Sequence, residues 1–188
     1  MRIITGKYKG RTLNAPHGLE TRPATDRVKT TIFNMLQNRI AIFGIYVLDL
    51  FAGTGNLGFE SLSRGAKHVV FVDDQEGALD VIERNAEMLG CIEQCAIMRN
   101  DALNFISRSK DQFDLIFADP PYAYERTQSI PANVFEKQML RSGGYLIIEH
   151  SKKLDFPASV LYQIVQRKEF GNTHVSFFIH PNGKGDAT

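Results

Sequence analysis

The chain has 188 residues, of which 43% are hydrophobic, so it is long enough for one domain with a sizeable core. No apolar run approaches the roughly 18 to 20 residues of a membrane-spanning helix, and no secretory leader is visible at the N-terminus. The net charge of only +1 argues against a uniformly basic nucleic-acid-binding protein. We expect a cytoplasmic protein in which Cys91 and Cys95 are free thiols rather than ligands of a metal.

The first predicted element is a short β-hairpin in residues 1–15, where loosely alternating residues surround Gly6 and Gly10. We assign residues 1–20 to an N-terminal extension. Residues 1–39 contain eight basic and two acidic side chains, and this excess of six leaves −5 for the remainder of the chain. The uneven charge favours a polyanionic partner, although clustered charge alone is equally compatible with a solvated surface.

A helix follows the hairpin, with Thr25 or Asp26 as its expected N-cap and with apolar residues at helical spacing from Val28 to Leu36. Beyond Gly44, short apolar strands alternate with helices. The expected strands are residues 45–51, 67–72, 94–99, 113–118, 145–149, 160–168 and 174–180. The expected helices between them are residues 57–64, 76–89, 102–108 and 129–141.

This alternation predicts an α/β fold with a doubly wound, Rossmann-like sheet of seven mainly parallel strands. The last two strands are joined by a short turn at Gly171–Asn172 and should be antiparallel. We expect residues 21–181 to form the main domain and residues 182–188 to be a disordered polar tail.

Acidic residues lie where the first four strands of the sheet end. Asp49 comes just before a glycine-rich turn, and Asp73, Asp101 and Asp119 close the next three strands. The carboxyl ends of parallel strands meet at one edge of the sheet, where ligands bind. Because charge near a buried edge is costly unless it binds something, the repeated acids predict a ligand site.

The glycine-rich turn from Gly53 to Gly58 matches the GxGxxG spacing, which by itself is weak support for a dinucleotide site. Asp49 would repel a pyrophosphate but suits the cationic end of S-adenosylmethionine. Asp73 could accept hydrogen bonds from the ribose hydroxyls and Asp101 from the adenine amine, and the glycines allow close approach. We predict S-adenosylmethionine as the cofactor, with a nicotinamide dinucleotide as the alternative, bound by Asp49, Phe51, Ala52, Gly53, Thr54, Gly55, Asp73, Asp74, Asp101 and Ala102.

The fourth strand ends in Asp119, Pro120, Pro121 and Tyr122. Proline fixes φ and has no N–H, so this turn is rigid and its carbonyl groups are free to accept. The Asp119 carboxylate and the Pro120 carbonyl can together hold both hydrogens of one exocyclic amine, which aims the nitrogen lone pair at a methyl donor. Tyr122 offers a face on which a base can stack. The four residues predict a catalytic site for direct methyl transfer, without a covalent enzyme intermediate.

Five longer motifs resemble the bacterial RsmD family over nearly the whole chain, up to about His180: MRIITGKYKGRTL, TRPATDRVK, LDLFAGTGNLGFESLSRGA, FDLIFADPPY and FGNTHVSFF. The resemblance implies a class I methyltransferase that transfers a methyl group from S-adenosylmethionine to a guanine N2 of 16S ribosomal RNA. It further implies a substrate in the assembled small ribosomal subunit, a monomer without a metal ion, and RNA contacts from Lys7, Lys9, Arg11, Arg22 and Arg27.

Two positions depart from the family's pattern: Asp73 stands where a glutamate is common, and Asn56 replaces a small residue. Three alternatives remain open. DNA adenine is disfavoured because the chain has no room for a target-recognition domain, and protein glutamine is disfavoured by the basic N-terminal region. A non-catalytic RNA-binding assembly factor is disfavoured by the intact acids and the Asp119–Tyr122 turn.

Overall fold

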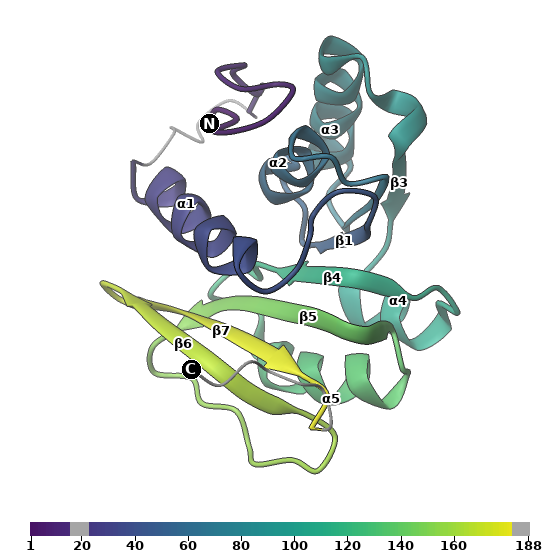
Figure 1. Ribbon diagram of the computed structural model, residues 1–188. Coiled ribbons are helices and arrows are strands. Elements are labelled where there is room, and N and C mark those ends of the chain that lie inside the picture. The colour runs from purple at the N-terminus through teal and green to yellow at the C-terminus, as the bar shows by residue number, and fades with distance from the viewer. Residues whose placement is uncertain (16–22, 182–188) are drawn as a thin grey trace.

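A seven-stranded sheet forms the centre of the molecule (Figure 1). The computed structural model describes residues 1–15 and 23–181, so Arg22 and the expected tail at 182–188 lie outside the described residues. The strand order is β3-β2-β1-β4-β5-β7-β6. The strands are β1 (Tyr46–Leu50), β2 (His68–Asp73), β3 (Cys95–Arg99), β4 (Phe113–Ala118), β5 (Leu140–Ser151), β6 (Gln163–Phe170) and β7 (Thr173–Ile179).

The first five strands pair in parallel, whereas β7 pairs antiparallel with both β5 and β6. The chain runs outward from β1 through β2 to β3 and then returns to place β4 on the other side of β1. This reversal between β1 and β4 is the position at which open α/β sheets bind ligands. The predicted fold class is confirmed, including the antiparallel strands at its end.

Helices cover both faces of the sheet (Figure 1). One apolar core joins the N-terminal segment and the first three helices to β4 through side chains such as Ile3, Phe33 and Phe117. The opposite core joins the last two helices to the sheet through side chains such as Ile116. Alternate residues of β4 thus point to opposite faces. The helices are α1 (Pro23–Gln37), α2 (Asn56–Ser63), α3 (Glu76–Leu89), α4 (Ala102–Arg108) and α5 (Ile130–Glu136), with short 3₁₀ turns at Ile92–Gln94 and Glu125–Ser129.

The N-terminal segment, residues 1–15, folds back on itself through one antiparallel bridge between Arg2 and Thr12. The backbone N–H of Ile3 donates to the carbonyl of Arg11 at 2.9 Å, which supports the same pairing. The expected hairpin is therefore reduced to a single bridge. Ile3 is buried in the core beneath this segment, so the segment packs on the main body. The division of the chain at residue 20 stays a prediction.

Several predicted boundaries are wrong; strand β6, for example, spans Gln163–Phe170 instead of residues 160–168, and β5 ends at Ser151 instead of Glu149. Helix α1 begins at Pro23, so Asp26 lies in its first turn and neither Thr25 nor Asp26 is the N-cap, because proline is well suited to the first turn of a helix. Helix α5 ends at Glu136, five residues early, and Gln138 follows with a positive φ of 53°. Strand β5 then begins at Leu140, before an irregularity in its pairing with β4.

No helix within residues 1–15 and 23–181 is both long and apolar enough to cross a membrane.

Candidate active site

Two adjoining cavities lie at the carboxyl ends of β1, β4 and β5. The first, which we call the Asp49 cavity, measures about 220 Å³ and is lined by Asp49, Lys29 and part of the glycine turn. The second, the Tyr122 cavity, measures about 740 Å³ and extends from Asp73 to Tyr122. Five residues line both cavities and so mark their junction: Met1, Phe51, Gly53, Asp119 and Glu149.

The glycine turn after β1 has a backbone that few residues can adopt. Phe51 has a φ of 62°, Gly53 of 55° and Gly55 of 75°, all in the left-handed region. A Cβ atom on Gly55 would lie 2.5 Å from the ring of Phe59, and one on Gly58 would lie 2.2 Å from the ring of Phe71. The turn therefore needs glycine both for its conformation and for close packing of α2 against β2.

The first two acids of the sheet edge hold this turn in place. Asp49 Oδ2 accepts a hydrogen bond from the N–H of Gly58 at 2.9 Å. Asp73 Oδ2 accepts from the N–H of Gly53 at 2.8 Å, and its Oδ1 accepts from the N–H of Gln75 at 2.9 Å. Each carboxylate oxygen has a second lone pair, so these bonds do not exhaust its capacity to accept from a ligand.

Asp49 is 2% exposed, and its environment disfavours its charge. Burial raises the pKa of its carboxyl well above the usual range, against the opposing effect of the Gly58 N–H. The neighbouring carboxylates of Asp119 and Asp73 raise this pKa further. A cationic ligand would relieve this repulsion, so the Asp49 cavity is suited to positive charge.

Lys29 fixes one side of the glycine turn from α1. Its buried ammonium donates to Asn56 Oδ1 and to the backbone carbonyl of Arg2, at 2.7 Å each. Glu60 Oε2 lies 3.6 Å from the same ammonium and accepts from the backbone N–H of Ile4 at 2.8 Å. Lys29 thus connects the N-terminal segment to the first residue of α2.

Asn85 of α3 fixes the other side of the turn in the same way. Its Nδ2 donates to the carbonyls of Thr54 and Asn14 at 3.2 Å each, and its Oδ1 accepts from the N–H of Asn14 at 2.8 Å. The side chain is fully buried. Both flanks of the turn are therefore held by residues that also hold the N-terminal segment.

The turn after β4 brings Asp119 and Tyr122 to the Tyr122 cavity. All described peptide bonds are trans, including those of Pro120 and Pro121. The Pro121 carbonyl accepts from the N–H of Tyr124 at 2.8 Å, which closes the turn. The Tyr122 side chain is largely exposed, and its hydroxyl lies 2.8 Å from Thr173 Oγ1. The ring is therefore held at one end while the rest of it stays accessible.

Asp119 has a raised pKa although much of the residue is open to solvent. Its carboxyl faces the junction of the two cavities, where desolvation raises its pKa to about 6. At neutral pH the carboxyl is mainly ionised and available as an acceptor.

Glu149 belongs to the same place and was missed from the sequence. Ile148 of β5 pairs with Ala118, the last residue of β4, so Glu149 lies beside Asp119 while it still pairs with Val175 of β7. Desolvation, and next the charge of Asp119, raise the pKa of Glu149 to about 8. The signal was present in the sequence, because Glu149 follows an apolar strand as the other acids do.

Asp101 and Ala102 do not line either cavity, unlike Asp73 and Asp74. Asp101 Oδ1 caps α4 by accepting from the N–H of Asn104 at 3.0 Å, and its Oδ2 pairs with Arg126 at 2.7 Å. A structural role therefore accounts for this acid, and its assignment to adenine stays a prediction. Within the described residues, no group of three or more histidine, cysteine, aspartate or glutamate side chains is placed to hold a metal ion.

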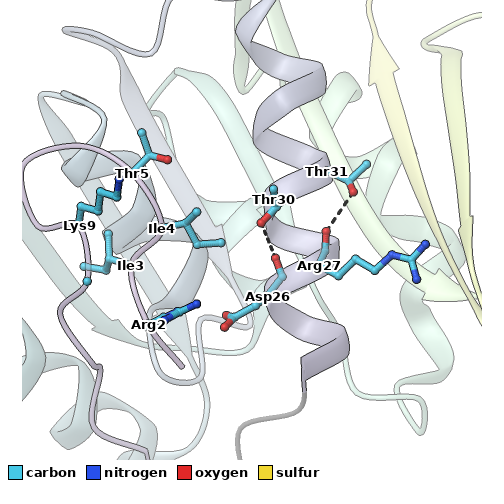
Figure 2. A pocket seen from close by; sticks show the side chains of 10 residues that line it. Arg2, Ile3, Ile4, Thr5, Lys9, Asp26, Arg27, Thr30 and Thr31 are labelled. Atoms are coloured by element: carbon cyan, nitrogen blue, oxygen red, sulfur yellow. Dashed lines mark hydrogen bonds between the residues drawn. The ribbon is translucent and has the colours of Figure 1, made fainter.

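Two of the predicted RNA-binding residues, Lys9 and Arg27, line a cavity other than the two at the strand ends. A third cavity of about 700 Å³ separates the N-terminal segment from α1, and Figure 2 shows Arg2, Lys9 and Arg27 on its walls. This third cavity is not a candidate for the catalytic site, although it is large, because none of the acids at the strand ends lines it. Arg11 donates to the carbonyl of Met88 at 3.0 Å, and Lys7 is exposed.

This sheet order, with a glycine turn after β1 and an acid–proline turn after β4, defines a class I methyltransferase fold. A solved structure from Escherichia coli, described as "Putative methyltransferase yhhF", superimposes with a TM-score of 0.84 and 26% identity. The match covers 96% of this chain and 97% of that one.

Residues 1–179 match the family described as "Conserved hypothetical protein 95", and the chain belongs to this family, the RsmD family indicated by its motifs. "Putative rRNA methyltransferase YlbH" of Bacillus subtilis is 38% identical over 95% of this chain and 98% of its own length. "Ribosomal RNA small subunit methyltransferase D" of Haemophilus influenzae is 31% identical over 97% of this chain and 94% of its own length. The predicted family is confirmed.

Proposed function

We propose that this protein transfers a methyl group from S-adenosylmethionine to the exocyclic N2 amine of a guanine in 16S ribosomal RNA. The observation that carries the proposal is the position of Asp119, on a rigid proline turn at the junction of two cavities. The names of the relatives, which include a ribosomal RNA small subunit methyltransferase D, support the substrate class. The choice of guanine N2 rests on the motifs shared with the family.

The residues present fit this cofactor. The Asp49 cavity is bordered by three carboxyl groups, those of Asp49, Asp119 and Glu149, and it suits a ligand with cationic sulfonium and ammonium groups. Asp73 and Asp74 line the neighbouring part of the Tyr122 cavity, where carboxylates can accept from ribose hydroxyls. When bound, S-adenosylmethionine supplies an electrophilic methyl group.

The chain's own residues position the amine and accept its charge. The ionised Asp119 carboxylate accepts a hydrogen bond from the amine, with the Pro120 carbonyl as the second acceptor. As the nitrogen becomes positive, the nearby carboxylate stabilises it and then takes its proton. The accessible ring of Tyr122 supports the base by stacking.

The N-terminal segment and α1 supply the contacts to RNA in this proposal. Arg2, Lys9 and Arg27 line one cavity, with Arg2 and Lys9 on the N-terminal segment and the Arg27 side chain extending away from them across α1, and each can pair with a phosphate (Figure 2). Lys7 and Arg11 belong to the same N-terminal segment, and Arg22, which lies outside the described residues, stays a predicted RNA contact. The chain is short, so we infer that part of the recognition comes from the folded surface of an assembled small ribosomal subunit, on which the protein acts as a monomer without a metal ion.

The first test is transfer of tritiated methyl groups from S-adenosylmethionine to small ribosomal subunits, naked 16S RNA and genomic DNA, taken from cells lacking the enzyme. We expect label in the subunits, released as N2-methylguanosine after digestion to nucleosides. Label found only in DNA would overturn the substrate but keep the amine chemistry. Cofactor binding without label in any substrate would instead favour a non-catalytic assembly factor.

A further inference from the structure

Glu149 is a second ionisable side chain at the junction of the cavities, and the function proposed above counts it only as a border of the cofactor cavity and gives it no role toward the substrate base. Of the five residues that line both cavities, only Asp119 and Glu149 have a titratable side chain. A group that borders both cavities is placed to touch a molecule that reaches from one to the other.

The sheet register sets these two carboxyl groups beside each other. Ala118 of β4 pairs with Ile148 of β5, and the next residue of each strand is the acid. Asp49 lies further from this end of the sheet, because its partner in β4 is Phe117, two residues before Asp119. Asp119 and Glu149 therefore form the outer pair of acids, next to Tyr122.

Carboxyl groups outnumber cations around this pair. The titratable groups that line the two cavities are those of Asp49, Asp73, Asp74, Asp119, Tyr122, Tyr124, Lys29 and His150 and the α-amino group of Met1, and Val175 of β7 pairs with Glu149 itself. Among these charges, that of Asp119 is the one that shifts the pKa of Glu149. The ammonium of Lys29 is bonded to Asn56 and Arg2. Burial lowers the pKa of His150, so it is neutral at pH 7. Two adjacent carboxyl groups in such surroundings do not both ionise readily.

Within residues 1–15 and 23–181, neither the carboxyl group of Asp119 nor that of Glu149 has a hydrogen bond or ion pair to the protein. Asp49 at the same edge is bonded to a backbone N–H. The outer pair is thus open to a ligand on its cavity side.

We propose that Glu149 contacts the substrate base and acts as a hydrogen-bond donor, its carboxyl O–H bonding the ring nitrogen that lies beside the reacting amine. This proposal rests on the proposed function. In guanine the N2 amine lies between N1, which carries a hydrogen and donates, and N3, which is unprotonated and can only accept; N3 is therefore the partner of the Glu149 O–H. Asp119 then remains the single anion of the pair and accepts from the amine itself.

The two carboxyl groups differ in their protonation during the reaction. Glu149 keeps its proton throughout the reaction, whereas Asp119 accepts the proton that the methylated amine loses and returns it to water. A donor on the ring nitrogen does not make the amine more nucleophilic, so the contribution of Glu149 is orientation of the base. A base with no unprotonated ring nitrogen beside its amine would be a poor substrate, because it offers no acceptor for the O–H of Glu149.

The test compares Glu149→Gln with Glu149→Ala in assays on small ribosomal subunits over a range of pH. Glutamine keeps an N–H donor at every pH, whereas alanine has none. The wild-type kcat/KM should fall above about pH 8, as Glu149 loses its proton. In Glu149→Gln this alkaline fall should disappear, with activity at pH 7 within about threefold of wild type. Glu149→Ala should be about 10- to 100-fold less active at pH 7.

Melting temperature and cofactor affinity of both variants establish that they fold and bind. An alkaline fall that persists in Glu149→Gln would overturn the proposal, as would equal activity of the alanine and glutamine variants. A Glu149→Gln variant that binds cofactor but has lost turnover would show that the ionised form is needed, which also overturns it. Absence of methyl transfer by the wild type would instead refute the function proposed above.

Discussion

The acids at the two halves of the sheet edge differ in what they bond. Beside β1, β2 and β3, Asp49, Asp73 and Asp101 each accept a hydrogen bond from a backbone N–H. At the ends of β4 and β5, the carboxyl groups of Asp119 and Glu149 bond no other group among the described residues and line both cavities. The first set holds the loops of the site in place, whereas the second leaves its carboxyl oxygens open to the cavities.

This difference shows that an acid at the end of a strand is not by itself a sign of a ligand. Each acid of the first set has a local reason to be there, since it satisfies N–H groups of a turn or a helix start. These acids can still accept from a ligand with their remaining lone pairs. The acids without such partners are the stronger candidates for chemistry.

The largest effect should come from removing the free acid of the fourth strand. Asp119→Ala should lower turnover on the order of 10³-fold, because the amine loses the group that holds it and balances its charge. Single-turnover methylation measures this, and calorimetry should show that S-adenosylmethionine still binds.

Asp119→Asn is the matched control, since it keeps the size and one acceptor but not the charge. It should have intermediate activity. Normal turnover by Asp119→Ala would show that this acid is dispensable, and the acids at β4 and β5 would then have no stronger claim to chemistry than those at β1, β2 and β3.

An acid of the first half should affect stability and binding together. Asp73→Ala leaves the N–H groups of Gly53 and Gln75 without their acceptor and should cost about 1–3 kcal/mol of unfolding free energy. It should also weaken S-adenosylmethionine binding about tenfold to a hundredfold.

Urea unfolding and calorimetry measure the two effects separately. Asp74→Ala is the control, because the exposed Asp74 bonds only the side chain of Gln75 and should leave stability nearly unchanged. A destabilised Asp73→Ala protein with full cofactor affinity would remove the ribose assignment and leave only the structural role.

The free acids should also make stability depend on pH in a particular direction. The pKa of Glu149 is raised to about 8 in the folded protein, above the roughly 4.3 of an unfolded glutamate. The folded state therefore holds a proton that the unfolded state has lost, and this stabilisation is present below about pH 4.3 and lost as pH rises towards 8.

Glutamine does not titrate, so Glu149→Gln removes this dependence of stability on pH. The difference in melting temperature, variant minus wild type, should therefore increase between pH 5 and pH 8, as measured by circular dichroism. A difference that stays constant over this range would mean that Glu149 is already ionised at low pH.

The smallest effect should come from the acid that caps α4. Asp101→Ala should cost about 1 kcal/mol through loss of the cap. Asp101→Asn keeps a capping oxygen and loses only the exposed ion pair with Arg126, so it should cost less than about 1 kcal/mol. Cofactor affinity tests the adenine assignment, because a role at adenine would weaken binding in the alanine variant beyond its effect on stability.

Much of the fold could be predicted because its signals are local. The bounds of α3, α4 and β4 match the expected ranges, since apolar periodicity and flanking polar residues mark them clearly. The start of β5 could not be predicted, because Leu140 joins the strand only through its pairing with Phe113. That contact depends on the assembled sheet.

The part of the site that could be predicted is the part set by the ends of the parallel strands. Asp49 and Asp119, which the motifs singled out, both line the Asp49 cavity. They gave no indication that Asp101 would be used to cap α4, although its bond to Asn104 is local. Lys29 and Asn85 could not be found, because they reach the glycine turn from distant positions in the chain.

The bonds of Lys29 and Asn85 limit what a truncation experiment can show. Removing residues 1–14 would take an acceptor from the buried ammonium of Lys29 and two partners from the buried amide of Asn85. Both side chains hold the glycine turn, so such a shortened chain should lose affinity for the cofactor as well as for RNA. A failure to methylate would then be ambiguous, and single changes at exposed cations such as Lys9 are the cleaner way to map the RNA.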